Sequence, residues 1–340
     1  MTAPAHLDAL ARMMPAISRE PRATNRDPFV LAEHSRPLSI LNVAFPFAAV
    51  GPDAVGGAEQ VLGHLDAGLV AAGHRSFVIA RRGSRTAGQL LAVGASRWPI
   101  DDRLREWMHA RYRRAIRRAL GRWPIDLVHM HGIDFHRYLP PHGVPVLVTA
   151  HLPPSWYPAE ALVPSRAETW LHGVSISQHH AFPAGAPLLP PIENGVPTRR
   201  LSARHAKRSF ALCVGRICPE KGFHIAFDAA KRAGLTLLLA GAVFPYEEHE
   251  RYLRTEIVPR LDDARRWIGP VGFARKRRLL SAARCLVVPS SAPETSSLVA
   301  MEALACGTPV VAFPSGALVE IVEDGRTGFL VADQGEMARA

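Results

Sequence analysis

The stretch PETSSLVAMEALACGTPVVA, residues 293–312, decides the fold of the second half of the chain. It follows an apolar run at residues 285–290, and it ends in a second apolar run at residues 309–313. Between the two runs, residues 297–305 have the composition of a helix. Short apolar runs on either side of a helix predict two parallel strands that are buried on both faces.

The same alternation extends over most of the chain. Further strands are predicted at residues 38–45, 76–80, 126–130, 145–150, 174–177, 210–215, 235–241 and 328–331, and further helices at residues 58–72, 103–120 and 222–233. A proline-rich break at about residues 181–207 separates two such blocks. We therefore predict an α/β protein with two doubly wound, Rossmann-like domains, in which ligands bind beyond the carboxyl ends of the strands.

The predicted boundaries are an extension at residues 1–37, an N-terminal domain at residues 38–194 and a C-terminal domain at residues 195–340. The 340 residues suffice for two separate cores. No run of 18 apolar, uncharged residues is present, so we expect no membrane-spanning helix, and the first residues lack the pattern of a secretory signal. Four cysteines without a C-x-x-C pair fit a cytoplasmic protein.

The net charge of +11 favours anionic partners, namely phosphates, lipid headgroups or nucleic acid, without choosing among them. Seven arginines lie in the predicted helix at residues 103–120, around an apolar stripe. Such a helix can lie on an anionic membrane, which would place the protein at the inner face of the membrane. The alternative is that the stripe packs on the first domain and the arginines are solvated.

Hydroxyl side chains gather where the strand at residues 285–290 passes into its helix. Thr295, Ser296 and Ser297 can cap that helix, and the backbone N–H groups near Leu298 and Val299 are donors at the positive end of its dipole. Phosphate groups bind readily at such a place. We therefore expect an anion site there.

Two glutamates flank this helix start. Glu302 lies on an otherwise apolar helix and needs a partner, because burial of a bare charge is prohibitive. Ribose hydroxyls would supply that partner, and so would a structural ion pair with an arginine. Glu294, eight residues earlier, could face the same ligand and bind sugar hydroxyls.

This pattern resembles the E-x7-E element of the retaining GT-B glycosyltransferases, in particular glycosyltransferase family 4. Glu294 and Glu302 occupy its two acidic positions, and residues 306–311, CGTPVV, match its G-x-P-V-V ending. The resemblance implies that Glu294 contacts the donor sugar and Glu302 the ribose. One departure is that Ser296 and Ser297 stand where the family usually has an aromatic-glycine pair.

A second match is VGRICPEKG, residues 214–222. Gly215 and Gly222 permit close backbone approach, while Arg216 and Lys221 bring two cations to one strand end. Such groups can stabilise the charge of a departing diphosphate without a metal ion. Alone, the pair would be two exposed cations at a helix start. The resemblance places them on the donor pyrophosphate.

Two weaker matches lie in the first half. Gly56 and Gly57, at a helix start, resemble the glycine-rich loop that covers the diphosphate in the family. His151, at a strand end, resembles the histidine that reaches the donor sugar, although a terminal histidine can equally face solvent. His129 and His131 could supply two zinc ligands, but no third ligand is suitably spaced, so no metal site is predicted.

The resemblance covers about residues 38–332. It implies a metal-independent transferase, without a cofactor, that moves a sugar from a nucleotide sugar to the hydroxyl of an unknown acceptor (a glycan, a lipid-linked molecule or a small molecule) with retention of configuration. The donor would bind the C-terminal domain. Alternatives are a nucleotide-sugar epimerase of the same fold, or a basic membrane- or nucleic-acid-binding protein with a degenerate site; nucleic acid is not the expected partner. Because family members usually continue through further helices, the C-terminal domain is short or truncated.

Overall fold

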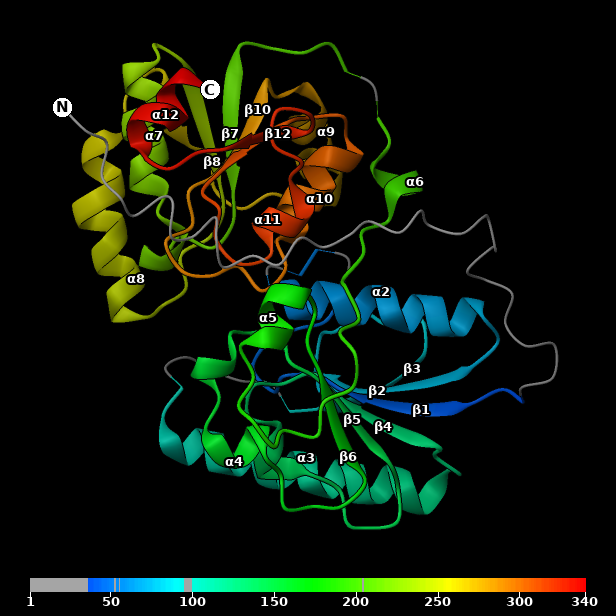
Figure 1. Cartoon of the computed structure of the whole chain (residues 1–340). Helices are drawn as coiled ribbons and strands as arrows, with labels where there is room; N and C mark the ends of the chain where they lie inside the picture. The colour runs from blue at the N-terminus through cyan, green and yellow to red at the C-terminus, as the bar shows by residue number, and fades with distance from the viewer. Residues whose placement is uncertain (1–35, 52, 55, 95–99, 204) are drawn as a thin grey trace. The chain divides into compact units, whose positions relative to one another are not determined.

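The structure is a computed structural model that describes residues 36–51, 53–54, 56–94, 100–203 and 205–340. Nearly all of the extension predicted at residues 1–37 lies outside these described residues. Residues 38–340 form one unit, which holds two parallel sheets of six strands each (Figure 1).

The first sheet has the strand order β3-β2-β1-β4-β5-β6. Its register pairs Ile40 of β1 with Ser76 on one side and with Leu127 on the other. The strands are β1 (Ser39–Val43), β2 (Arg75–Arg81), β3 (Gln89–Val93), β4 (Leu127–Met130), β5 (Val146–Thr149) and β6 (Thr169–His172). Apolar runs buried on both faces thus form the parallel sheet that the sequence predicts.

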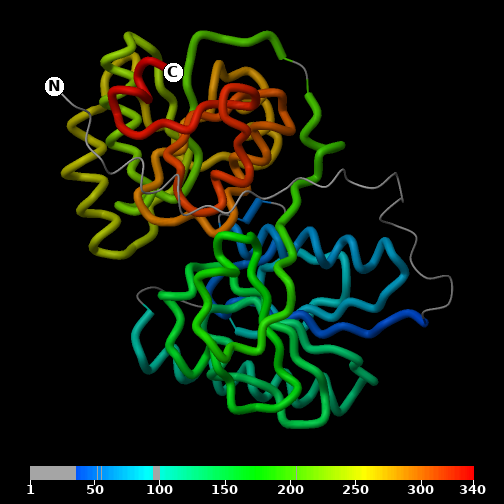
Figure 2. The backbone as a smooth tube through the Cα atoms, viewed as in Figure 1, coloured from blue at the N-terminus to red at the C-terminus, as the bar shows by residue number. Residues whose placement is uncertain are grey.

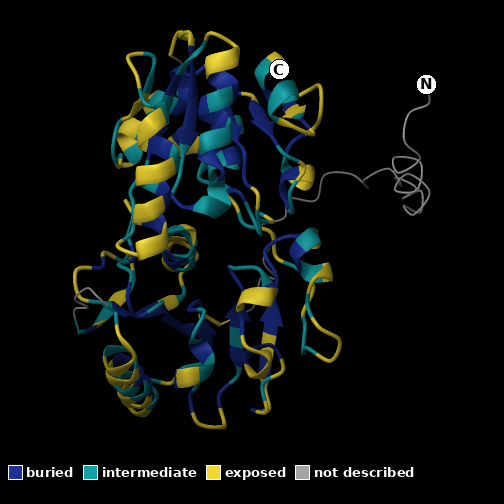
Figure 3. Cartoon of the chain, turned by 90° about the vertical axis from the view of Figure 1, so that its left-hand side faces the viewer, coloured by how far each residue is buried: buried dark blue, intermediate teal, exposed yellow. Residues whose placement is uncertain are grey.

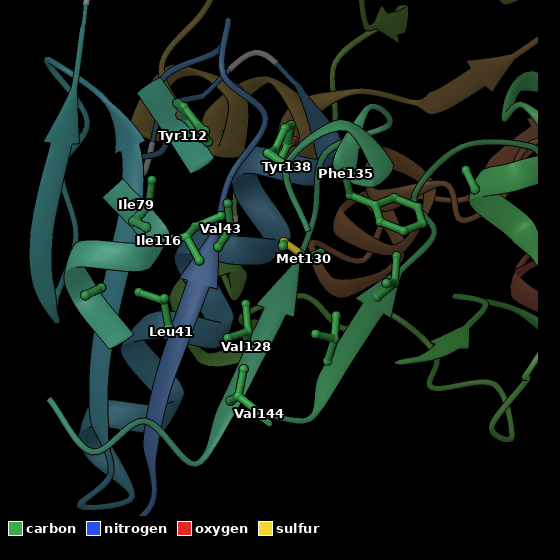
Figure 4. Packing of buried hydrophobic residues seen from close by; sticks show 14 of the residues in the cluster. Leu41, Val43, Ile79, Tyr112, Ile116, Val128, Met130, Phe135, Tyr138 and Val144 are labelled. Atoms are coloured by element: carbon green, nitrogen blue, oxygen red, sulfur yellow. The ribbon is translucent and has the colours of Figure 1, made fainter. Parts of the chain in front are cut away.

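Helices cover both faces of this sheet. Helix α2 (Gly57–Ala71) and helix α3 (Asp102–Arg122) lie on opposite sides of it (Figure 1). Phe77 and Ile79 of β2 belong to the core under α3, whereas Val78 belongs to the core under α2. This alternation follows from the two-residue period of a strand. Figure 4 shows the α3 side, where Tyr112 and Ile116 of the helix are drawn with side chains of β1, β2 and β4.

The second sheet has the order β12-β11-β10-β7-β8-β9. Its strands are β7 (Phe210–Val214), β8 (Thr236–Ala240), β9 (Arg265–Trp267), β10 (Cys285–Val288), β11 (Val310–Ala312) and β12 (Gly328–Leu330). Helices α7 (Phe223–Arg232) and α12 (Gln334–Arg339) contribute to the core on one face. Helices α9 (Phe273–Ala282) and α10 (Leu298–Ala305) contribute to the core on the other.

Shorter helices connect these elements, and Figure 2 traces the chain through them. They are α4 (Ala159–Leu162), α5 (Ile176–His180), α6 (Thr198–Leu201), α8 (Glu247–Tyr252), α11 (Leu318–Ile321), the 3-10 turns η1 (Phe135–Tyr138), η2 (Pro154–Trp156), η3 (Pro219–Lys221) and η5 (Val258–Arg260), and the π-helical turn η4 (Leu253–Ile257). Strands are largely buried, and helices are exposed on their outer sides (Figure 3).

Both sheets have the order of a dinucleotide-binding fold. In each, the order reverses direction between the first and fourth strands, β1 and β4 or β7 and β10. Ligands of such sheets bind at this reversal, beyond the carboxyl ends of the strands. The prediction of two doubly wound, Rossmann-like sheets is confirmed.

The strand predicted at residues 174–177 is wrong. The sixth strand is Thr169–His172, and Ser175 instead begins α5, because its side chain accepts a hydrogen bond from the backbone N–H of Gln178. The prediction also omits β3 and β9. Two of the three residues of β9 are arginines, so it shows no apolar run. β3 does contain an apolar run at residues 90–93, which the prediction overlooked.

The basic helix α3 uses its apolar stripe inside the fold. Met108, Tyr112 and Ile116 have no exposed surface. Trp107 is exposed, with the guanidinium of Arg111 over its ring at 4.6 Å from the centroid. The structure therefore shows the alternative in which the stripe packs on the first domain. Four of the seven arginines are exposed and three are half-buried. Among the described residues, no helix is long and apolar enough to cross a membrane.

Candidate functional site

Two loops meet at the reversal point of the second sheet. The first follows β7 and contains η3, and the second follows β10. The backbone N–H of Ser291 donates to the carbonyl oxygen of Glu220, 2.9 Å away. Gly222 has φ +60°, and a Cβ atom there would overlap the carbonyl oxygen of Pro289. Only glycine fits this approach, so the predicted role of Gly222 is explained by the contact between the two loops.

The contact between the two loops brings Lys221 next to Glu294. Nζ of Lys221 lies 2.5 Å from Oε1 of Glu294. The Ser290 hydroxyl donates to the same oxygen. Burial by itself would raise the pKa of Glu294, but the charge and hydrogen bond of Lys221 outweigh it and hold the pKa below its ordinary value. Glu294 is therefore a carboxylate, and its second oxygen is left for a ligand.

Arg216 is a second cation beside Glu294. Its charge lowers the pKa of Glu294 and that of Glu59. Its guanidinium lies over the ring of Phe244, 5.5 Å from the centroid. Its Nε is buried and has no hydrogen-bond partner among the described residues. Arg216, Lys221 and Glu294, which the sequence predicts at one site, thus lie close together. The buried Nε of Arg216 remains as a hydrogen-bond donor for an anion.

Glu302 forms a structural ion pair, which is the second of the two alternatives predicted for it. Its partner is a lysine rather than an arginine. Only 3% of its surface is exposed, and Oε1 lies 2.6 Å from Nζ of Lys276 on α9. Burial raises the pKa of Glu302 above its ordinary value, and Lys276 opposes the rise. Since Lys276 uses one oxygen, the other can still accept from a hydroxyl.

The helix cap differs from the prediction. Ser297 precedes α10, but its side chain makes no capping hydrogen bond. The backbone N–H of Leu298 donates to the carbonyl of Ser296 at 3.1 Å, so this donor is already used. Thr295 donates from its hydroxyl to the carbonyl oxygen of His151 at 2.8 Å. Capping by Thr295, Ser296 and Ser297 is therefore wrong. The predicted anion site therefore loses the N–H of Leu298 as a free donor, whereas the N–H of Val299 and the hydroxyls of Ser296 and Ser297 stay predicted donors.

Gly56 and Gly57 lie at the start of α2, as predicted. A Cβ atom on Gly56 would overlap the carboxylate of Glu59, and one on Gly57 would lie 3.5 Å from Cδ1 of Leu298. Glu59 itself is buried, and burial raises its pKa while Arg216 opposes the rise. Sequence reasoning did not select Glu59 as a site residue. The sequence feature that could have identified Glu59 is its position, an acidic residue in the first helical turn after two glycines.

His151 is buried at the end of β5, so the solvent-facing alternative is wrong. Its Nε2 lies 3.0 Å from Nδ1 of His131. Burial, with the nearby His172, lowers its pKa to about 3. The imidazole is therefore neutral, and it can exchange hydrogen bonds with a sugar without carrying a charge.

Three further histidines adjoin it. Thr149 makes hydrogen bonds of 2.7 Å to Nε2 of both His129 and His172. Nε2 of His131 is buried without a partner among the described residues. His172 was not predicted, because its strand was misplaced. The group forms a buried, uncharged network.

Two family models match the chain. "Glycosyltransferase Family 4" matches residues 55–181, and "Glycosyl transferases group 1" matches residues 208–340. A glycogen synthase of Mycobacterium tuberculosis is 28% identical in an alignment that covers 82% of this chain and 79% of the relative.

Solved structures agree with these matches. AviGT4, a glycosyltransferase involved in avilamycin A biosynthesis, superposes with a TM-score of 0.64 at 25% identity, over 89% of this chain and 87% of that one. HepE of Anabaena in complex with UDP-glucose superposes with a TM-score of 0.67 at 19% identity, over 88% of each chain, which shows a shared fold.

Two parallel sheets of the Rossmann order, matched over nearly their whole length by such structures, define a glycosyltransferase of the GT-B fold. With both halves matched, the chain belongs to the group 1 and family 4 glycosyltransferases. The predicted family is thereby confirmed.

Proposed function

We propose that this glycosyltransferase transfers a sugar from a nucleotide-diphosphate sugar to an acceptor hydroxyl, with retention of anomeric configuration and without a metal ion. The observation that carries the proposal is the Lys221–Glu294 pair, 2.5 Å between Nζ and Oε1, beside the partly unpartnered guanidinium of Arg216. Two fixed cations and an ionised acid stand together at the reversal point of the second sheet.

Arg216 and Lys221 stabilise the diphosphate as it leaves. Fixed cations in a partly desolvated site act more strongly than the same charges in water and need no reorganisation during the reaction. This is the role that a divalent metal has in other transferases. The N–H groups at the start of α10, near Val299, add donors at the positive end of a helix.

The sugar and ribose are oriented by uncharged and charged acceptors. The free oxygen of Glu294 accepts from sugar hydroxyls, and that of Glu302 accepts from the ribose. His151, held neutral by burial, lies in the network at the end of β5 and contacts the sugar near the reacting carbon. Gly56 and Gly57 let the backbone approach the diphosphate.

In the transfer, the bond from the anomeric carbon to the diphosphate breaks, and the acceptor oxygen bonds to the same face of the sugar. The proton of the acceptor hydroxyl passes to the departing diphosphate. Retention rests on the family resemblance. Glu294 is a poor nucleophile because Lys221 and Ser290 both donate to its Oε1. We therefore assign it to positioning the sugar rather than to a covalent intermediate.

The complex of HepE with UDP-glucose supports a nucleotide-sugar donor, since that protein shares the fold. It does not choose the nucleotide for this chain. All four cysteines are free, which supports a reducing compartment such as the cytoplasm.

A thermal-shift panel of UDP-, GDP- and ADP-sugars, without added Mg²⁺ or Mn²⁺, tests the donor. A ligand that binds only the folded state raises the melting temperature, so we expect one nucleotide to do so without metal. Lys221→Ala should lose the shift, and the exposed Lys231→Ala should keep it. A shift that needs a divalent ion, or one that survives in Lys221→Ala, contradicts the proposal.

Product analysis separates the remaining alternatives. Incubation with the donor alone yields free altered sugar if the chain is an epimerase, whereas a transferase needs an acceptor. Salt-dependent binding of nucleic acid without any nucleotide-sugar shift would identify a basic binding protein instead. The anomeric configuration of the product, read by proton NMR coupling, decides between retention and inversion.

A further inference from the structure

Three potential metal ligands gather beside the Lys221 segment. Cys218 precedes η3, Glu220 lies within it, and His249 lies on α8. Each offers one ligand atom, and the three atoms lie within 4.8 Å of one another. Cys218 is fully buried and His249 is 7% exposed. This group shares no residue with the assigned donor site.

Two buried polar atoms of this group lack a hydrogen-bond partner. Oε2 of Glu220 and Nδ1 of His249 are both buried and have no hydrogen-bond partner among the described residues. The Cys218 thiol makes a long contact, 3.5 Å, to the carbonyl oxygen of Arg216, and it also interacts with the carboxylate of Glu220, a second member of the group. Buried polar atoms are normally satisfied, so two orphans in one cluster indicate a missing ligand.

We propose that Cys218, Glu220 and His249 form a binding site for Zn²⁺. Sulfur, imidazole nitrogen and carboxylate oxygen are the three ligand types that zinc takes in proteins, and a site of three protein ligands leaves a fourth position for water. The thiol suits zinc far better than magnesium or calcium, which prefer oxygen ligands.

The charges of the neighbourhood permit this ion. Binding would displace the thiol proton, forming the Zn–S bond and releasing H⁺ to the buffer. The two anionic ligands then balance the 2+ charge of the ion, so the nearby Arg216 faces a neutral cluster. The ion is not a participant in sugar transfer. It would fasten η3, which carries Lys221, to α8.

Titration of Zn²⁺ into the tag-free, reduced full chain, measured calorimetrically in two buffers of different ionisation enthalpy, tests the site. We expect one Zn²⁺ per chain with proton release. Cys218→Ser and His249→Ala should each lower the affinity at least about tenfold, since even the loss of an outer partner costs that much. Cys285→Ser and the exposed His142→Ala are matched controls that should bind like the wild type.

Cobalt(II) gives an independent readout. The wild-type chain with one equivalent of Co²⁺ should show a thiolate-to-metal absorption band that Cys218→Ser lacks and Cys285→Ser keeps. No band in the wild type, or zinc affinity unchanged in both ligand variants, overturns the proposal. Because the wild-type spectrum needs no variant to fold and no sugar to bind, its outcome is separate from that of the transferase proposal.

Discussion

Lys221 donates to Glu294 across 73 positions of sequence, with 2.5 Å between Nζ and Oε1. The side chain of Glu294 is 10% exposed and that of Lys221 is 31% exposed. The pair joins the loops that follow β7 and β10. It therefore has a structural effect and a proposed role toward the donor, and these can be separated by experiment.

Removing one member of this pair should affect folding and donor binding differently from removing both. Lys221→Met leaves a buried, unpaired carboxylate, and Glu294→Gln leaves a lysine without its anion. We expect a coupling energy of about 0.5–3 kcal/mol between them in urea unfolding, so that the double variant is more stable than the sum predicts. Independent, additive effects would show that the pair does not exist in solution.

Turnover should not be rescued in the same way. Lys221→Met should lower kcat/KM about 10²–10³-fold, because a fixed transition-state donor contributes about that much, and the double variant should stay at least as slow. Rescue of activity along with stability would assign the pair a structural role only. The exposed Lys231→Ala serves as the control for a lost positive charge.

Glu302 offers a test of ribose recognition. Its Oε1 is held by Lys276 at 2.6 Å, so the proposed ribose contact depends on the other oxygen. Glu302→Gln should reduce the preference for a ribonucleoside diphosphate over its 2′,3′-dideoxy analogue by about 1.5–3 kcal/mol, the value of a hydrogen bond to a charged group. Calorimetric binding of both ligands measures it. An unchanged preference, like that expected for the exposed Glu247→Gln, would remove Glu302 from the donor site.

The sequence predicts the strands that are continuously apolar and the residues that adjoin them. Residues 210–214 and 285–288 are of this kind, and Arg216 and Glu294 follow these two strands. It does not predict partners supplied by other elements. Lys276 and Glu59 gain their roles from packing, because nothing in their own segments distinguishes a buried ion pair from a solvated charge. The failed cap at Ser297 has the same cause, since tertiary contacts of Thr295 replace the local hydrogen bond.

Gly222 and Gly234 form a matched pair of glycines. Both have left-handed φ, +60° and +63°, but a Cβ on Gly234 meets nothing within 4 Å, whereas one on Gly222 overlaps Pro289. Gly234→Ala should cost about 1–2 kcal/mol of unfolding free energy for the backbone conformation alone. Gly222→Ala should cost about 1–3 kcal/mol more for the overlap. It should also lower the sugar-transfer activity that depends on the adjoining Lys221. Equal costs in urea unfolding would mean that the two loops do not touch.

The histidine network predicts how stability depends on pH. Burial lowers the pKa of His129 and His151 to about 3, and it lowers that of His131 well below the ordinary value of 6.5. Below pH 6.5 these histidines take up protons in the unfolded chain but stay neutral in the folded one. The unfolding free energy should therefore fall as the pH drops from 6.5 toward 3, by up to about 1.4 kcal/mol per pH unit for each group.

Urea unfolding at pH 7, 6 and 5 measures this slope. His129→Asn removes one buried titrating group, so the slope should become shallower by up to about 1.4 kcal/mol per pH unit. His142→Asn removes an exposed histidine and should keep the wild-type slope. The sign matters: a chain that becomes more stable as the pH falls would require these imidazoles to be charged in the folded state, and His151 could then not be the neutral partner of a sugar.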